Sequence, residues 1–87
     1  MIDHLTLNVA DLRSAKAFYL AALKPLGYAV VMEFPEVCGM GIAGKPDFWL
    51  AQNGRTTPAL HLAFSSPDRA TVDAFHRAAL AAGGKDN

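Results

Sequence analysis

The sequence HLTLNVADLRSAKAFYLAALKPLG, residues 4–27, occurs twice in this chain in recognisable form. The second copy is HLAFSSPDRATVDAFHRAALAAGG, residues 61–84, and the offset of 57 residues holds without a gap. Nine of the 24 aligned positions are identical, where unrelated segments would share about one or two. Self-similarity at a fixed offset predicts a duplicated strand–helix module. The identical pairs are His4/His61, Leu5/Leu62, Asp11/Asp68, Ala17/Ala74, Phe18/Phe75, Ala21/Ala78, Ala22/Ala79, Leu23/Leu80 and Gly27/Gly84.

The length of 87 residues is enough for one domain. We expect a single domain over residues 1–87, with a first module at 1–57 and a partial second module at 58–87. Because the second copy has about half the length of the first, the chain is expected to be C-terminally truncated. Hydrophobic residues make up 52% of the sequence, more than a small lone domain can readily bury. This composition favours a homodimer.

Charge and cysteine content narrow the class of protein. Eight Lys and Arg residues balance eight Asp and Glu residues, so nothing favours binding to nucleic acid or to an anionic membrane. No apolar run approaches the roughly 20 residues that span a bilayer. The single cysteine, Cys38, cannot form an internal disulfide, which is typical of a reducing compartment. We therefore expect a cytoplasmic protein whose partner is a small molecule.

The first copy predicts one strand and one helix. From Ile2 to Val9, Leu5 and Leu7 alternate with His4 and Thr6, which indicates a strand with one apolar and one polar face. Asp11 is predicted to cap the helix that follows, and Pro25–Gly27 to end it. The helix carries an apolar stripe at Ala15, Phe18, Tyr19, Ala22, Leu23 and Leu26.

The rest of the first module predicts three more strands. They are Tyr28–Phe34, Cys38–Ala43 and Phe48–Ala51, separated by turns at Pro35–Glu36 and Gly44–Asp47. Gly39 and Gly41 leave one face of the middle strand bare, which predicts either a bulge or a group that packs closely against its backbone. Residues 53–58 are expected to form the loop between the modules.

The second copy predicts a strand at Ala59–Ser65 and a helix capped by Asp68 and stopped by Gly83–Gly84. The helix stripe consists of Val72, Phe75, Ala79 and Ala82. The predicted order is therefore βαβββ followed by βα. This pattern is typical of an α+β fold.

His4 and His61 occupy the same position in the two copies, on the polar face of each predicted strand. If a pseudo-twofold axis relates the copies, the polar faces close on each other and the imidazoles converge. Two imidazoles with one carboxylate bind first-row divalent metals and leave positions open for substrate. Hydrogen-bonded structural histidines are the alternative. No carboxylate of the sequence is an obvious third ligand, and Asp3 is expected to face away from His4.

Several motifs resemble the vicinal oxygen chelate superfamily, which includes glyoxalase I, bleomycin-resistance proteins, fosfomycin-resistance enzymes and extradiol dioxygenases. They are IDHLTLNV at 2–9, SAKAFY at 14–19 and LGY at 26–28. The run DFWL at 47–50, followed by Gly54, is similar to the end of the first module in small bacterial members. The resemblance covers essentially the whole chain and implies paired βαβββ modules, the second of them incomplete.

The resemblance also implies a metal site. His4 and His61 match the ligand histidines of the two modules, and the family's third ligand is a carboxylate on a strand beyond this sequence. The intact protein is then expected to hold Fe, Mn, Zn or Ni and to act as a metal-dependent lyase or dioxygenase on a small substrate with adjacent oxygens. In this fragment the site is expected to be incomplete. The four-ligand glyoxalase site needs Glu or Gln where Phe48–Leu50 is apolar, with Gln52 just beyond.

Two other functions stay open: a metal-free protein that binds a drug or antibiotic, as bleomycin-resistance proteins do, and an inactive fragment that dimerises. Thr6, Trp49 and Gln52 are the candidates for a substrate cleft, although core packing is an alternative role for Trp49. Cys38 is more readily explained as a small buried residue than as a nucleophile. No catalytic residue is assigned.

Overall fold

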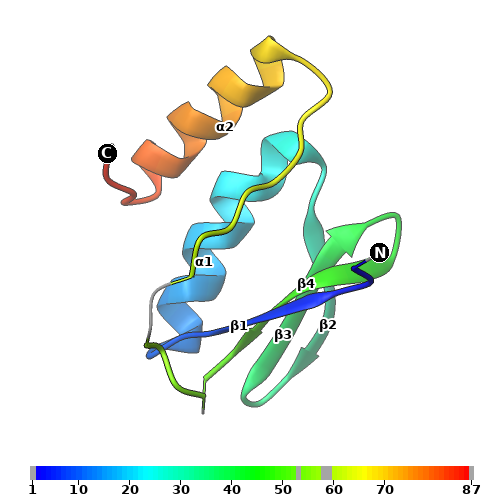
Figure 1. The fold of residues 1–87 in the computed structure, drawn as a ribbon, viewed down its shortest axis with the longest axis vertical. Helices are drawn as coiled ribbons and strands as arrows, with labels where there is room; N and C mark the ends of the chain where they lie inside the picture. Colours follow the sequence, from blue (N-terminus) through cyan, green and yellow to red (C-terminus); the bar gives the residue numbers. More distant parts are fainter. Residues whose placement is uncertain (1, 53, 58–59, 87) are drawn as a thin grey trace.

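The computed structural model describes residues 2–52, 54–57 and 60–86. The helices are α1 (Leu12–Leu23) and α2 (Arg69–Ala81), and a short 3-10 turn, η1 (Lys24–Leu26), follows α1. The strands are β1 (Leu5–Asn8), β2 (Ala29–Phe34), β3 (Val37–Ile42) and β4 (Lys45–Ala51). Figure 1 shows α2 running beside α1, outside the layer of strands. The predicted α+β class is confirmed.

The four strands form one sheet in the order β1-β4-β3-β2. The strands β2, β3 and β4 are antiparallel neighbours, whereas β1 pairs with β4 in parallel. The pairing aligns Leu5 with Phe48 and Thr6 with Trp49. A parallel pair needs a crossover, and α1 with the β2–β3 hairpin supplies it. The first module is thus a βαβββ unit, as its sequence predicted.

The helix α1 starts and stops where the sequence indicates. The Asp11 carboxylate accepts hydrogen bonds from the backbone N–H groups of Arg13 and Ser14, as an N-cap residue does. At the other end Gly27 adopts a φ of 88°, and its N–H donates to the Lys24 carbonyl at 2.9 Å. Glycine reaches this left-handed conformation without steric cost, so the chain can turn back into β2.

A small apolar core lies between α1 and the sheet. Because side chains alternate along a strand, every second residue of β3 and β4 reaches it. The Cys38 thiol is fully buried there, and its burial raises the pKa of the thiol, so it stays protonated and packs as a small apolar group. The core residues are Leu12, Leu23, Cys38, Met40, Phe48 and Leu50.

The predicted turn at Gly44–Asp47 is too long. The hairpin turns at Ala43 and Gly44, which have φ angles of 56° and 75°, and β4 begins at Lys45. Proline usually marks a loop, but Pro46 is tolerated in this strand because it lies opposite Gly41 at an irregularity in the β3–β4 pairing. A Cβ atom on Gly41 would lie 1.9 Å from the Lys45 carbonyl oxygen, so only glycine fits there.

The second module is only partly as predicted. The helix α2 begins after Asp68, whose carboxylate accepts the Thr71 N–H at 2.7 Å. The predicted strand Ala59–Ser65 is wrong over residues 60–65, which enter no sheet; Ala59 lies outside the described residues. In the first module β1 is held by a later strand of the same module, and residues 82–86 form no such strand. Of the predicted loop 53–58, the described residues 54–57 have no regular structure.

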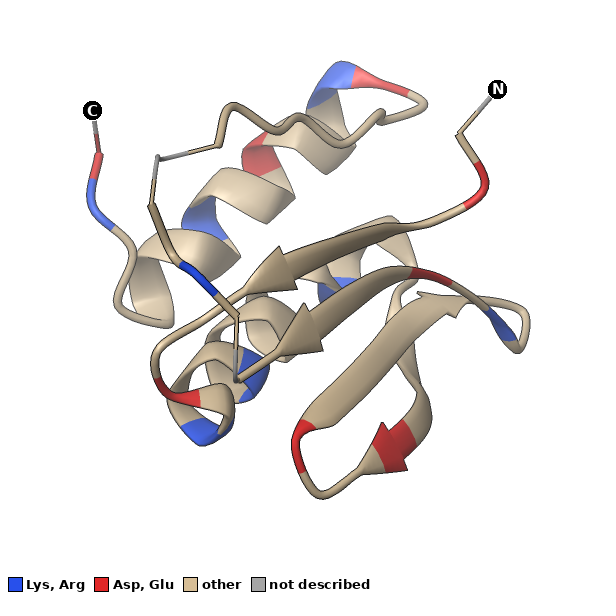
Figure 2. Ribbon diagram, turned by 60° about the horizontal axis from the view of Figure 1, so that its bottom comes forward, with Lys and Arg blue, Asp and Glu red and all other residues tan. Residues whose placement is uncertain are grey.

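Charged residues are scattered along the ribbon in Figure 2: α1 carries basic positions alone, whereas α2 and the start of β4 carry both signs. This agrees with the formal net charge of zero. In the described part of the chain, no helix is long and apolar enough to cross a membrane.

Candidate functional site

The sheet has one face turned away from α1, which we call the open face. Leu5 and Leu7 pack toward the core, so Thr6 between them points to the open face. The β1–β4 register sets Trp49 beside Thr6. These two residues and His4 line a hollow of about 380 Å³, together with Asp3, Lys45 and Pro46. The structure therefore brings together His4, Thr6 and Trp49.

Trp49 is held on the open face by a glycine. A Cβ atom on Gly39 would lie 2.8–2.9 Å from three atoms of the Trp49 six-membered ring, so the indole lies over the bare Gly39 backbone. This contact explains why Gly39 is fully enclosed although it carries no side chain. The prediction that a group packs against the glycine-containing strand is confirmed. Trp49 thus packs on one ring face and remains partly exposed.

His4 is paired with the residue before it. Its Nδ1 lies 2.9 Å from an Asp3 carboxylate oxygen, and this hydrogen bond is the main cause that lowers the pKa of Asp3. Since the carboxylate can only accept, Nδ1 carries the proton and the lone pair of neutral His4 lies on Nε2. The imidazole is 57% exposed, so Nε2 is available to a ligand or a metal.

Sequence reasoning missed Asp3 and Lys45 as residues of this hollow. Asp3 was expected to face away from His4, but it precedes β1, so strand alternation does not govern its direction. Lys45 was assigned to a turn and instead opens β4, next to the bulge. The signal in the sequence for that bulge was Gly41, since a glycine within a strand often marks a bulge.

Gln52 lies elsewhere. Its side-chain oxygen accepts a hydrogen bond from the Leu12 N–H at 3.0 Å, at the first turn of α1. Its backbone N–H donates to the Glu36 carbonyl at 3.0 Å. Gln52 therefore joins the end of β4 to the start of α1, and the structure does not place it with Thr6 and Trp49.

His61 lines a different hollow, of about 340 Å³, whose other lining residues include Asp3, Leu5, Asp47 and Phe48. The hollow that His4 lines does not include His61, and the hollow that His61 lines does not include His4. Among residues 2–52, 54–57 and 60–86, no group of three or more His, Cys, Asp or Glu side chains could hold a metal ion. The described residues therefore supply no complete ligand set, and metal binding through His4 and His61 stays a prediction.

Tyr28, in the hollow of His61, should make stability fall at high pH. Its hydroxyl donates to Asp47 at 3.1 Å, and burial, followed by this hydrogen bond, raises its pKa from 10.0 to about 12. Between these pH values the folded state retains a proton that the unfolded state loses. The contribution of the Tyr28 hydroxyl to the free energy of unfolding is therefore complete below pH 10 and is lost as pH rises toward 12. Urea unfolding at a series of pH values should show this loss, and Tyr28→Phe should reduce it. An unchanged pH dependence in Tyr28→Phe would assign the loss to other groups.

Comparison with known proteins was made for the sequence and for the fold. No protein-family model and no curated protein sequence matches this chain. Among solved structures, the fold is similar to the crystal structure of a glyoxalase/bleomycin resistance protein from Albidiferax ferrireducens T118. The two chains share 28% sequence identity, with a TM-score of 0.76 over 93% of this chain and 71% of that chain. By its fold, this chain belongs to the vicinal oxygen chelate superfamily, as its opening strand and helix indicated.

Proposed function

We propose that this chain is a small-molecule-binding module whose ligand is a planar aromatic compound carrying an anionic oxygen. The observation that supports this proposal is the placement of Trp49 over Gly39 on the open face. An indole held on one side by backbone offers its free side as a flat surface. Aromatic rings gain about 0.5–1.5 kcal/mol from stacking beyond the area they bury.

The polar groups around Trp49 fit the rest of such a ligand. Lys45 contributes a positive charge to the same hollow, Thr6 a hydroxyl, and His4 an imidazole held by Asp3. A cation attracts an anionic oxygen, while the hydroxyl and the imidazole can hydrogen-bond an oxygen next to it. The hollow of about 380 Å³ lies within the usual size of small-molecule sites, about 300–1,000 Å³.

Salicylate tests this proposal because it carries a carboxylate and a hydroxyl on adjacent ring carbons. Calorimetric titration should detect its binding, and Trp49→Ala should weaken the binding at least tenfold. Leu20→Ala is the control, since it removes an exposed apolar side chain from α1, away from the hollow. Binding of equal strength in both variants would contradict the proposal.

A metal-dependent reaction is the second candidate, and the Asp3–His4 pair is the observation that favours it. Metal-binding histidines commonly donate their other ring N–H to a carboxylate, and His4 does so to Asp3. A metal held there would act as a Lewis acid on adjacent substrate oxygens. Since the described residues do not complete a ligand set, the remaining donors have to come from other groups.

Metal analysis distinguishes the two candidates. The purified protein should be loaded in turn with Fe, Mn, Zn and Ni, alongside His4→Ala and His61→Ala. The metal-dependent candidate requires metal in the parent protein and a loss in both variants. Equal metal content in all three proteins would exclude both histidines as ligands.

We further propose that the chain forms a homodimer through β2. This strand lies at one edge of the sheet and exposes Met32 and Phe34 by 48% and 55%. A free edge with exposed apolar side chains pairs readily with another strand, and a twofold axis would set β2 against β2 of a second copy. Light scattering should give twice the chain mass, and Phe34→Lys should give a monomer. A monomeric parent protein at high concentration would contradict this arrangement.

A further inference from the structure

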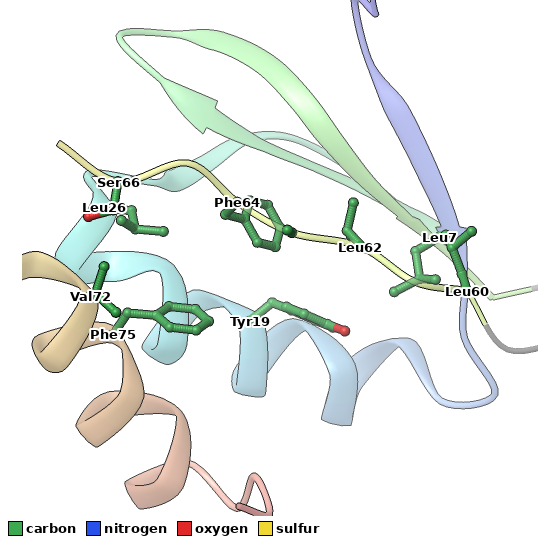
Figure 3. A pocket seen from close by; sticks show the side chains of 10 residues that line it. Leu7, Tyr19, Leu26, Leu60, Leu62, Phe64, Ser66, Val72 and Phe75 are labelled. Atoms are coloured by element: carbon green, nitrogen blue, oxygen red, sulfur yellow. The ribbon is translucent and has the colours of Figure 1, made fainter. Parts of the chain in front are cut away.

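A second hollow, of about 540 Å³, lies on the core side of the sheet, where Leu7 lines it (Figure 3). It is lined by residues of α1, η1, α2, β1 and the segment 60–66, and it is partly open to solvent. Leu7 lies at one end, Tyr19 and Phe75 on the helix side, and Phe64 facing them. The hollow is separate from the salicylate site proposed above, because the two share no lining residue.

Two residues of the wall, Tyr19 and Phe64, are held by ring contacts. Phe48, only 2% exposed, packs edge-to-face against Tyr19 on one side and Phe64 on the other, with ring centroids 5.1 Å apart in both pairs. Tyr28 packs against Phe64 in the same way at 5.8 Å. Segment 60–66 is therefore anchored over the core by Phe64, although it enters no sheet. Tyr19 and Phe64 are therefore in place before a ligand binds, which lowers the entropic cost of binding.

The chemistry of the wall restricts the ligand. None of the residues that line the hollow carries a charge. Its two hydroxyl groups belong to Tyr19 and Ser66, and the Ser66 hydroxyl already donates to the Asp68 carbonyl at 3.1 Å. Ser66 can thus accept a hydrogen bond, and Tyr19 can donate or accept one. An ion that entered this hollow would lose part of its hydration and find no counter-charge, which costs free energy. A neutral ring does not carry this cost.

We propose that this hollow is a second binding site, for a neutral aromatic molecule of one or two rings that carries a single hydroxyl group. The ring lies among Tyr19, Phe64 and Phe75, and the hydroxyl bonds to Tyr19 or Ser66. Its volume is within the usual range for small-molecule sites, about 300–1,000 Å³. This site prefers a neutral ligand, whereas the open-face site prefers a negatively charged one. A neutral and an anionic probe therefore distinguish the two sites.

Two naphthalene probes test the proposal. 2-Naphthol is neutral at pH 7, whereas naphthalene-2-sulfonate has the same ring system and a permanent negative charge. Calorimetric titration should show binding of 2-naphthol, with at least tenfold weaker binding of the sulfonate at this site. Equal affinities, or no binding of 2-naphthol, would overturn the proposal.

Variants locate the binding. Val72 lines the hollow from α2 and is 46% exposed, so a larger side chain can enter the hollow without disturbing the buried core. Val72→Trp should weaken 2-naphthol binding at least tenfold. Leu80→Trp is the matched control because Leu80 is 40% exposed on the same helix and does not line the hollow. Equal affinity of the two variants for 2-naphthol would place the probe elsewhere. Displacement of 2-naphthol by salicylate would also overturn the proposal, because it would place the probe in the open-face site.

Should a second copy fill the hollow instead, Val72→Trp would lower the mass measured by light scattering and the parent protein would not bind 2-naphthol. That result would also overturn the proposal. It is distinguishable from pairing through β2, which Phe34→Lys removes and Val72→Trp leaves intact.

Discussion

Phe48→Ala should lower the free energy of unfolding by about 3–5 kcal/mol, as large-to-small changes of buried aromatic residues do. Phe48 is 2% exposed and lies between the rings of Tyr19 and Phe64. Its loss would leave a cavity and remove an edge-to-face contact from each of them. Small domains have a total stability of about 5–15 kcal/mol, so this loss is a large share of the total.

Urea unfolding followed by Trp49 fluorescence measures this change. The control is Leu20→Ala, at a position on α1 that is 37% exposed, for which we expect a loss below about 1 kcal/mol. Both variants replace a large apolar side chain by alanine, one at an exposed position and one in the core, so the difference between them mainly reports burial. A loss of similar size in both variants would show that Phe48 is not the centre of the core.

Gly39→Val should abolish binding on the open face and leave the fold largely intact. The position has no positive φ, so the backbone accepts a side chain, but a Cβ atom would meet the Trp49 ring at 2.8 Å. The indole is the end of a side chain on the open face and can rotate away from the strand. The flat surface that supports the proposed ligand would then be lost, and salicylate affinity should fall at least tenfold.

Circular dichroism and salicylate titration together test this expectation. Ala29→Val is the control, since it adds bulk at an exposed position of β2, away from Trp49. Gly39→Val should keep the parent's spectrum and lose salicylate, and Ala29→Val should keep both. A Gly39→Val protein that still binds salicylate at full affinity would show that the position of Trp49 does not matter to the ligand.

The first module could be predicted from the sequence because its signals are local. Alternation at Leu5 and Leu7 fixed the faces of β1, and hence the direction of Thr6. Asp11 and Gly27 marked the ends of α1 and η1 by well-understood capping. The start of β4 was missed because Pro46 normally indicates a loop, and the glycine that admits it lies on the neighbouring strand.

The remaining errors have three separate causes. Residues 60–65 have the alternation of a strand, but alternation cannot say whether a neighbouring strand is present to bond with them. The approach of Asp3 to His4 depends on the chain before β1, where no strand pattern applies. Gln52 was a candidate for the cleft by proximity in sequence to Trp49, whereas its amide is used at the start of α1.

The parallel pairing of β1 with β4 also determines how this chain assembles. The β2–β3–β4 meander joins neighbours in sequence, so it can form with little loss of chain entropy. The pairing of Leu5 with Phe48, by contrast, closes a loop that includes α1 and the meander. We infer that β1 docks late, after the transition state for folding. Sequence changes in β1, including those at Thr6, then shorten the lifetime of the native state while leaving the folding rate nearly constant.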